Sequence, residues 1–146
     1  MTFSQERIAD VWDEAWPLMV ANANESGLQV LPFQPNRRVY DELEALGATR
    51  LYTARAAGVL VGYALFLLSF HPQYAGTKLA MQEVMYVDPA HRGFGAAKFL
   101  AYTDQALKAE GAGAVMRHVR HGAVDYGKSL ERMGYLPIQT AYLKVV

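Results

Sequence analysis

The sequence lacks cysteine altogether, and it lacks an excess of charge of either sign. Without cysteine there can be no disulfide bond, thiol nucleophile or cysteine-ligated metal, and a reducing compartment is the natural expectation. Fourteen basic side chains balance fourteen acidic ones. Nucleic acid is therefore not expected as the main partner, because binding to phosphates requires a surplus of lysine and arginine.

Long apolar runs are missing as well. The most apolar stretch, residues 59–70, is interrupted by Gly62 and Ser69, and it is far shorter than the roughly 20 residues that span a bilayer. The first residues mix Glu6 and Arg7 with apolar side chains, which is unlike a secretory signal. We therefore expect a cytoplasmic protein without a membrane partner.

A length of 146 residues with 52% hydrophobic content is typical of one domain, which we expect to span residues 1–146. Helical spacing predicts a first helix capped by Ser4 and running through Met19, with a kink or break at Pro17. Further helices are predicted over residues 36–47, 95–111 and 124–133. Strands are predicted over residues 51–55, 59–68, 80–87 and 114–119, with one or two more within 135–146.

The order of these elements predicts the sheet. The strands up to residue 87 follow one another as an antiparallel meander, whereas residues 80–119 form a strand–helix–strand unit whose two strands should be parallel. The fold class is therefore α+β, with a mostly antiparallel mixed sheet flanked by about four helices. Trp12 and Trp16 lie on one face of the first helix, where they either pack in the core or line a substrate groove.

Residues 85–98 carry the most informative pattern, because a strand ends there, the chain turns on two glycines and a helix begins. Gly93 and Gly95 permit close approach of the backbone to a ligand. The first N–H groups of a helix lack internal partners and carry partial positive charge. These groups predict a cradle for a phosphate or pyrophosphate, to which Arg92 can add a charge-assisted contact. A purely structural turn is the alternative.

Three phosphate-binding patterns compete for this segment. The Walker A string G-x-x-x-x-G-K-[ST] does not occur in the sequence. The dinucleotide fingerprint G-x-G-x-x-G fails because Lys98 stands where the third glycine would be. The pattern Q/R-x-x-G-x-G/A at a helix start is met in full by residues 92–97.

With this pattern the chain resembles the GNAT superfamily of acyl-CoA-dependent N-acetyltransferases. Members often read Val-x-Pro-x-x-Arg-Gly-x-Gly-x-Gly/Ala before a helix, as residues 87–97 do, and close with Glu-Arg/Lys-x-Gly-Phe/Tyr, as residues 131–135 do. The order of elements over residues 36–146 is also similar. The wording of the last third most resembles members encoded in phage and prophage genomes.

The resemblance implies two parallel strands that splay apart at a bulge and hold acyl-CoA between them. Separated strands leave N–H and C=O groups unpaired, and an amide-rich pantetheine can satisfy them. The pantetheine would pair with the strand before the motif, and the pyrophosphate would rest on the helix amides. The implied cofactor-binding residues are Met85, Tyr86, Val87, Arg92, Gly93, Phe94, Gly95, Ala96, Ala97 and Lys98.

Acetylation of an amine requires a neutral amine, stabilisation of the carbonyl oxygen and a proton for the departing thiolate. Glu83 lies on the predicted strand about where members that use a carboxylate base carry it. Because an acid within an apolar strand is costly unless it is solvated or paired, Glu83 either opens onto the cleft as a base or sits in an exposed or salt-bridged position. Its alternation partners on the strand would be Met81, Met85 and Val87.

The proton donor departs from the family pattern. Members commonly carry a tyrosine five residues before the aromatic residue of the closing motif, where this sequence has Leu130. Tyr126, one turn earlier, either delivers the phenol proton or packs against CoA. Ala123 stands where members often have a CoA-binding asparagine. His118, on the second parallel strand, is an alternative base because histidine titrates near neutrality, although lone histidines are also structural.

His71 and Tyr74 fall in the predicted loop before the cleft strand, where acceptor-binding residues are expected. The four histidines show no metal-ligand spacing, so no metal is expected. The resemblance thus implies direct transfer of an acetyl group from acetyl-CoA to a primary amine, of a small molecule or a protein, in a ternary complex. The last strand could exchange or pair across two copies and so form a homodimer.

Two alternatives stay open. The departures at Ala123 and Leu130 would also fit a non-catalytic CoA-binding interaction module, such as a phage accessory protein. The same cradle could hold ATP or NAD in a nucleotide-binding regulator.

Overall fold

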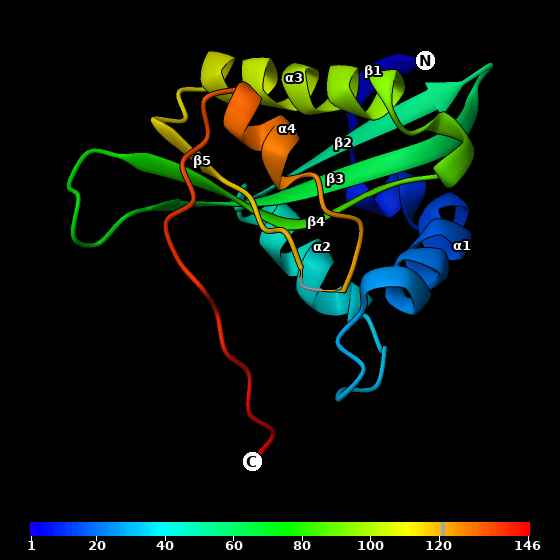
Figure 1. Cartoon of the computed structure of the whole chain (residues 1–146), viewed down its shortest axis with the longest axis horizontal. Coiled ribbons are helices and arrows are strands. Elements are labelled where there is room, and N and C mark those ends of the chain that lie inside the picture. The colour runs from blue at the N-terminus through cyan, green and yellow to red at the C-terminus, as the bar shows by residue number, and fades with distance from the viewer. Residues whose placement is uncertain (121) are drawn as a thin grey trace.

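The computed structural model describes residues 1–120 and 122–146 and confirms a mixed α+β fold. His121 lies outside the described residues. The elements are β1 (Thr2–Glu6), α1 (Ile8–Ser26), α2 (Arg37–Ala45), β2 (Thr49–Ala56), β3 (Val59–Phe70), β4 (Lys78–Val87), the 3-10 turn η1 (Pro89–His91), α3 (Phe94–Ala109), β5 (Ala114–Met116) and α4 (Gly127–Arg132) (Figure 1).

The strands form one sheet in the order β1-β2-β3-β4-β5. Neighbouring strands are antiparallel except for β4 and β5, which are parallel, as the sequence predicted. Helix α3 packs on one face, where Phe99 and Leu107 are fully buried, and α1 packs on the other through Val11 and Ala15 (Figure 1). The sheet therefore separates two apolar cores, and β3 lies between them.

The start of the chain differs from the prediction. Residues 2–6 form an edge strand paired with β2, and Ser4 does not cap a helix; α1 begins at Ile8 with Arg7 before it. Tertiary contacts decide this, because the ring of Phe3 stacks on Phe99 at a centroid distance of 5.3 Å and the Ser4 hydroxyl meets that of Thr53 at 3.1 Å. Phe99 and Thr53 lie far from residues 2–6 in the sequence, so helical spacing could not reveal these contacts.

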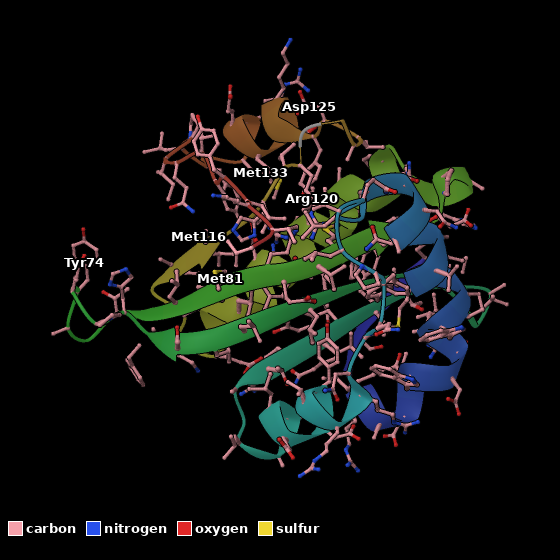
Figure 2. All side chains as sticks on the ribbon, turned by 90° about the horizontal axis from the view of Figure 1, so that it is seen from below. Tyr74, Met81, Met116, Arg120, Asp125 and Met133 are labelled. Atoms are coloured by element: carbon pink, nitrogen blue, oxygen red, sulfur yellow. The ribbon has the colours of Figure 1, made fainter. Side chains whose placement is uncertain are left out.

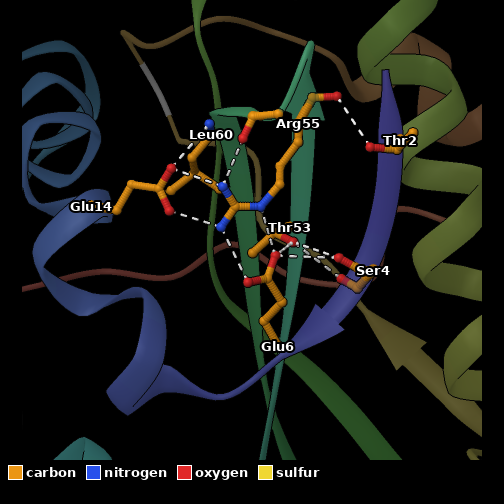
Figure 3. Close-up of polar contacts among 8 residues, drawn as sticks. Thr2, Ser4, Glu6, Glu14, Thr53, Arg55 and Leu60 are labelled. Carbon is orange, nitrogen blue, oxygen red and sulfur yellow. Dashed lines mark hydrogen bonds and ion pairs between the residues drawn. The ribbon is translucent and has the colours of Figure 1, made fainter.

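Arg55 ties β1, β2 and α1 together (Figure 3). Its guanidinium donates from Nε to Glu6 at 2.9 Å and from Nη2 to Glu14 at 2.8 Å. Hydrogen bonds from Arg55 hold the pKa of Glu6 and that of Glu14 below the usual range of a glutamate. The edge strand is thus attached to the sheet by charge as well as by its ladder.

Pro17 does not divide the first helix, which runs unbroken from Ile8 to Ser26. Proline removes the amide that would bond to the carbonyl of Asp13. Both residues are exposed, so water can satisfy that carbonyl and the helix continues. On this helix Trp12 is half-buried, whereas Trp16 is exposed and packs beside Phe33.

A β-bulge interrupts β4 at Glu83. Leu65 pairs with Val84 and the next residue, Phe66, pairs with Gln82, so Glu83 has no partner on β3. An extra residue reverses the alternation of side chains beyond it. Val84 therefore packs with the α1 core, and the expectation that Glu83 shares a face with Met85 and Val87 was wrong.

The parallel pair is short. Strand β4 pairs with β5 only from Leu79 to Met81, opposite Ala114 to Met116, although β4 continues to Val87. The predicted second parallel strand therefore ends three residues early. Beyond Met81 and Met116 the two segments are no longer paired. This is the splayed arrangement that the resemblance implied.

The last residues differ from the prediction as well. Residues 135–146 contain no helix or strand, although one or two strands were expected there. Their apolar side chains are left largely in solvent: Leu136 is 80% exposed and Tyr142 is 94% exposed. Across the described part of the chain, no helix combines the length and hydropathy needed to cross a bilayer.

Candidate active site

The turn between β4 and α3 presents free backbone amides. The Asp88 carboxylate accepts from the Ala90 amide at 2.9 Å and shapes the short turn η1. Gly93 then adopts φ +69°, which only glycine reaches without strain, and α3 begins at Phe94. The first helical hydrogen bond runs from Ala97 N to Gly93 O at 3.0 Å. Within the described residues, the amides of residues 94–96 have no acceptor, as the sequence predicted.

A cleft of about 320 Å³ lies between β4, the start of α3 and the segment leading into α4. Backbone groups of β4 form one side of the cleft. In a strand, the N–H and C=O groups of successive residues point alternately to the two neighbouring sides. The Asp88 N–H donates toward β3 to Val61 O at 2.8 Å, and the Val87 C=O accepts from Arg92 on the other side. Met85 and Val87 therefore turn their peptide groups away from β3 and toward the cleft.

The cleft brings together most of the residues that the resemblance assigned to the cofactor. Those on its wall are Met85, Tyr86, Val87, Arg92, Gly93, Ala96 and Ala97. Phe94, Gly95 and Lys98 lie outside the wall: the Phe94 ring is 76% exposed with the Lys98 ammonium 4.5 Å from its centroid, and Gly95 faces Met1. Phe94 and Gly95 can serve the cradle through their free amides, whereas the amides of Ala97 and Lys98 lie within the helical ladder, so that Lys98 could serve it only through its ammonium group.

Arg92 is folded back onto the protein. Its Nε donates to Val87 O at 2.8 Å, its Nη2 donates to the Glu25 carboxylate at 2.6 Å, and its guanidinium lies 5.5 Å from the Tyr86 ring centroid. The side chain thus links α1 to the end of β4 at the rim of the cleft. An anion in the cleft would have to compete with Glu25 for it.

Glu83 lies where the cleft meets a second cavity, and its side chain is on the wall of both. The bulge directs this carboxylate toward α2, where it accepts a hydrogen bond from the Tyr40 hydroxyl at 3.3 Å. Glu83 is exposed to solvent, as one of the two expectations had it. The protein atoms around its carboxyl group partly desolvate it and raise its pKa, while the Tyr40 hydrogen bond and the charge of Arg120 act in the opposite direction. A carboxyl group in this setting can take up a proton closer to neutral pH than an ordinary glutamate.

The second cavity has a volume of about 470 Å³ and opens on the α1 side of the sheet. Helix α1, the loop of residues 27–35 and Tyr40 form its walls, and side chains of β3 and β4 form its floor. Asn22, Glu83, Val84 and Arg120 belong to both cavities. The two cavities therefore adjoin at Glu83.

Tyr126 and His118 lie on the far side of the cleft. The Tyr126 hydroxyl donates to His118 O at 2.6 Å and accepts from Gln82 Nε2 at 3.1 Å, and burial raises the pKa of this phenol. The His118 Nδ1 faces Gln82 O at 3.0 Å. The His118 imidazole thus reaches the backbone of β4 at Gln82, beyond the last residue at which β4 and β5 pair.

A buried arginine supports this side of the cleft. The Arg117 side chain is fully buried, and it donates to Gln82 Oε1 at 3.0 Å, to Thr103 at 2.7 Å and to Asp104 at 2.5 Å. Because Arg117 occupies the carboxamide oxygen of Gln82, the NH2 group of Gln82 must face Tyr126. Arg117 therefore fixes the Gln82 amide that orients the phenol.

His71 and Tyr74 are not brought to this site. They lie in the β3–β4 hairpin loop, with ring centroids 4.5 Å apart, and neither lines the cleft or the second cavity. Figure 2 shows Tyr74 at the tip of the hairpin, well separated from Arg120. Within the described residues, no group of three metal-ligating side chains is close enough to hold a metal ion.

Sequence reasoning missed Tyr40, Arg117 and Arg120. Tyr40 and Arg120 reach the site from segments that no motif marks, and Arg117 lies where an apolar strand was expected. Only Arg117 gave a signal in the sequence. A charged residue inside a predicted buried strand needs a partner, which indicates a polar cluster around it.

A sheet opened between parallel strands beside unpartnered helix amides is the architecture that the resemblance implied. A profile of the Acetyltransferase (GNAT) family matches residues 8–135. The chain therefore belongs to this family of acyl-CoA-dependent acetyltransferases, a class of enzymes. No curated protein sequence matches the chain.

Solved structures of similar fold cover nearly the whole chain. A ribosomal-protein-alanine N-acetyltransferase from Brucella melitensis biovar Abortus 2308 is 20% identical, with full coverage of both chains and a TM-score of 0.75. An aminoglycoside acetyltransferase from an uncultured soil metagenomic sample, in complex with sisomicin, is 15% identical over 99% of this chain and 95% of its own, with a TM-score of 0.75. A predicted acetyltransferase with acetyl-CoA from Clostridium acetobutylicum is 13% identical over 99% and 95%, with a TM-score of 0.73. At these identities the likeness is one of fold.

Proposed function

We propose that this protein transfers an acetyl group from acetyl-CoA to a primary amine, of a small molecule or a protein, by direct attack in a ternary complex. The observation that carries the proposal is the position of Glu83, on the wall of both the cleft and the second cavity. One carboxylate can thus reach an amine in the cavity and a thioester in the cleft.

The cleft fits acyl-CoA. The free amides of residues 94–96 suit a diphosphate, and the peptide groups of Met85 and Val87 suit the amides of a pantetheine arm. The proposed cofactor-binding residues are Met85, Tyr86, Val87, Arg92, Gly93, Ala96 and Ala97 on the wall, Phe94 and Gly95 through their free amides, and Lys98 through its ammonium group.

In the proposed reaction the amine nitrogen attacks the thioester carbonyl, a C–N bond forms and the C–S bond breaks. Glu83 accepts the proton that the amine loses, directly or through water. Tyr126 donates its phenol proton to the departing thiolate, and Glu83 then releases its proton to solvent while the Tyr126 phenolate regains one from solvent. His118, which also lines the cleft, is the alternative base.

The test is release of free CoA thiol in the presence of primary amines. We expect turnover by the unmodified chain, and a loss of roughly 100-fold or more in kcat for Glu83→Gln if Glu83 is the general base. Glu131→Gln, at an exposed carboxylate of α4, is the matched control and should retain full activity. An unchanged rate for Glu83→Gln across the pH range would transfer the role to His118, which His118→Ala then tests.

Two observations favour a second candidate, a CoA-binding module without catalysis, such as a phage accessory protein. Leu130 occupies the usual tyrosine position and is buried, and the Tyr126 proton points to a backbone carbonyl. Stabilisation by CoA beyond that by ADP, with no thiol release for any amine, would support this candidate. Equal stabilisation by CoA and ADP would instead support a nucleotide-binding regulator.

We also propose that two copies associate through residues 135–146. Apolar side chains of this extended segment are exposed in one copy, and β5 leaves an open edge at the end of the sheet. An exposed edge and an unpaired apolar segment favour strand exchange. Light scattering should give twice the mass of one chain, and Ile138→Lys with Tyr142→Lys should give the mass of one. A single-chain mass for the unmodified protein would contradict this proposal.

Three broader features also belong to the proposal. A single domain over residues 1–146 is supported by the continuous sheet. A cytoplasmic location is supported by the lack of cysteine. An origin in a phage or prophage genome is supported by the residue pattern of the last third of the sequence.

A further inference from the structure

We infer that the acceptor is a primary amine carried on an aromatic or branched apolar body, and that a polycation is not accepted. This inference rests on the proposed function, because it assigns the second cavity to the acceptor. That cavity has a volume of about 470 Å³, which suffices for a small molecule or the end of a peptide side chain. Its chemistry can therefore select the body that carries the amine.

The walls of the second cavity are mostly apolar. Trp12 and Met19 project from α1, and Leu31 and Phe33 come from the loop of residues 27–35. Leu31 and Phe33 remain partly open to water, with 44% and 47% of their surface exposed. An exposed apolar patch of this kind gains free energy when an apolar group covers it. A strongly hydrated ligand would leave that gain unrealised.

Three aromatic rings, those of Trp12, Phe33 and Tyr40, line the cavity. The Trp12 and Tyr40 centroids lie 5.8 Å apart at an interplanar angle of 52°, and Phe33 packs beside Trp16 at 6.1 Å. Tilted rings at these distances are favourable aromatic pairs, and a third ring can extend such a cluster. The aromatic cluster lies on the side of the cavity formed by α1, α2 and the loop.

The charges of the cavity argue against a polycation. Among the described residues, its lining contains one carboxylate, Glu83, and one guanidinium, Arg120. Arg120, labelled in Figure 2, lies on the wall of both cavities and donates to Ser26 O at 2.7 Å. It takes part in none of the ion pairs among the described residues. Several ammonium groups would need several carboxylates, and they would be repelled by Arg120. One ammonium group can meet the Glu83 carboxylate, whereas a second would find only uncharged acceptors in the lining.

The test compares amines and includes a readout that does not depend on turnover. The chain has two tryptophans, so Trp16→Phe leaves Trp12, on the cavity wall, as the only one. We expect 2-phenylethylamine to change the Trp12 fluorescence and to saturate, whereas spermidine and kanamycin do not. In the thiol-release assay, 2-phenylethylamine should exceed both polycations in kcat/KM by roughly tenfold or more, the range in which apolar pockets discriminate.

Variants of the unmodified chain separate the cavity from general stability. Phe33→Ala should raise KM for 2-phenylethylamine several-fold with little change in kcat or in KM for ethylamine. Phe70→Ala removes a phenylalanine that is 71% exposed and lies outside the cavity lining, at the end of β3, and should change neither. Leu31→Ser provides a second cavity variant if Phe33→Ala folds poorly.

The outcomes are distinct. Turnover of spermidine or kanamycin in preference to 2-phenylethylamine would overturn the inference and leave the proposed function intact. Saturable fluorescence change with 2-phenylethylamine but no thiol release from any amine would overturn the proposed function and keep the cavity assignment. No fluorescence response, or the same KM for Phe33→Ala and the unmodified chain, would overturn the inference.

Discussion

The hydroxyl of Tyr40 donates a hydrogen bond to the carboxylate of Glu83 at 3.3 Å. Tyr40 belongs to α2 and Glu83 is the bulge residue of β4, so the bond joins two elements that lie far apart in the sequence. It is the one side-chain hydrogen bond that Glu83 makes to the described residues. Tyr40 therefore influences the protonation of the proposed base without needing to contact the reacting atoms.

Replacement of Tyr40 by Phe should shift the pH dependence of activity. Partial desolvation raises the pKa of Glu83 and the Tyr40 hydrogen bond lowers it, so loss of the hydroxyl raises this pKa further. A base must be ionised to act, and activity falls as the pH drops through its pKa. The acid limb of kcat/KM should therefore move to higher pH, by up to about one unit. Tyr142→Phe, at an exposed tyrosine, should leave the profile in place. A profile of Tyr40→Phe that overlays the unmodified one would remove Glu83 as the titrating base.

Replacement of Tyr126 by Phe tests the proton donor. If the phenol protonates the thiolate, kcat should fall by roughly 100-fold while the Kd of CoA changes little. Gln82 loses a hydrogen-bond acceptor, which should lower the free energy of unfolding by only about 1 kcal/mol, so the variant should stay folded. Tyr74→Phe at the hairpin tip is the control. Full activity of Tyr126→Phe would show that this tyrosine only lines the cleft.

A charge at Gly95 should weaken CoA binding. A side chain there would meet the flexible end of Met1, at 2.4 Å from a Cβ, which can move aside. A glutamate at a helix start favours the helix itself, so Gly95→Glu should fold, yet it repels a diphosphate held by the same amides. Calorimetry should show affinity for CoA at least about tenfold weaker for Gly95→Glu than for Gly95→Gln, which adds the same bulk without charge. Equal affinities of the two variants would place the diphosphate elsewhere.

The Glu6–Arg55 contact predicts a pH-dependent contribution to stability. The pKa of Glu6 is lowered in the folded state, chiefly by the Arg55 hydrogen bond, so its contribution is present above the ordinary glutamate pKa and disappears as the pH falls through the lowered value. Near pH 7, Glu6→Gln should reduce the free energy of unfolding by about 1–2 kcal/mol, an amount limited by partial exposure to solvent. Denaturant titrations at acid pH should show the difference vanish. A constant difference at all pH values would mean that the charge contributes nothing.

The phosphate cradle could be predicted from sequence because it is a local feature. Residues 87–97 follow one another through a strand end, a turn and a helix start, and the amides of residues 94–96 are left free by helix geometry alone. The parallel pairing of β4 and β5 was also predictable, since it follows from the short connection through α3.

The surroundings of the proposed base could not be predicted because they depend on long-range pairing. The bulge at Glu83 arises from the register between β3 and β4, and the carboxylate meets Tyr40 only when α2 is in place. Arg117 reaches Gln82 and Asp104 only after three elements have packed. Likewise, residues 2–6 form a strand because β2 and α3 offer them partners, which no local pattern in the sequence records.

The central claim is that acetyl-CoA is held by the backbone of β4 and α3 within reach of Glu83. Its most direct test is titration of the isotope-labelled protein with CoA, followed by the shifts of individual backbone amides in NMR spectra. We predict the largest shifts at residues 94–96 and at Met85 and Val87, with smaller ones at Glu83. Shifts confined to other parts of the chain, or no saturable shifts at all, would contradict the account.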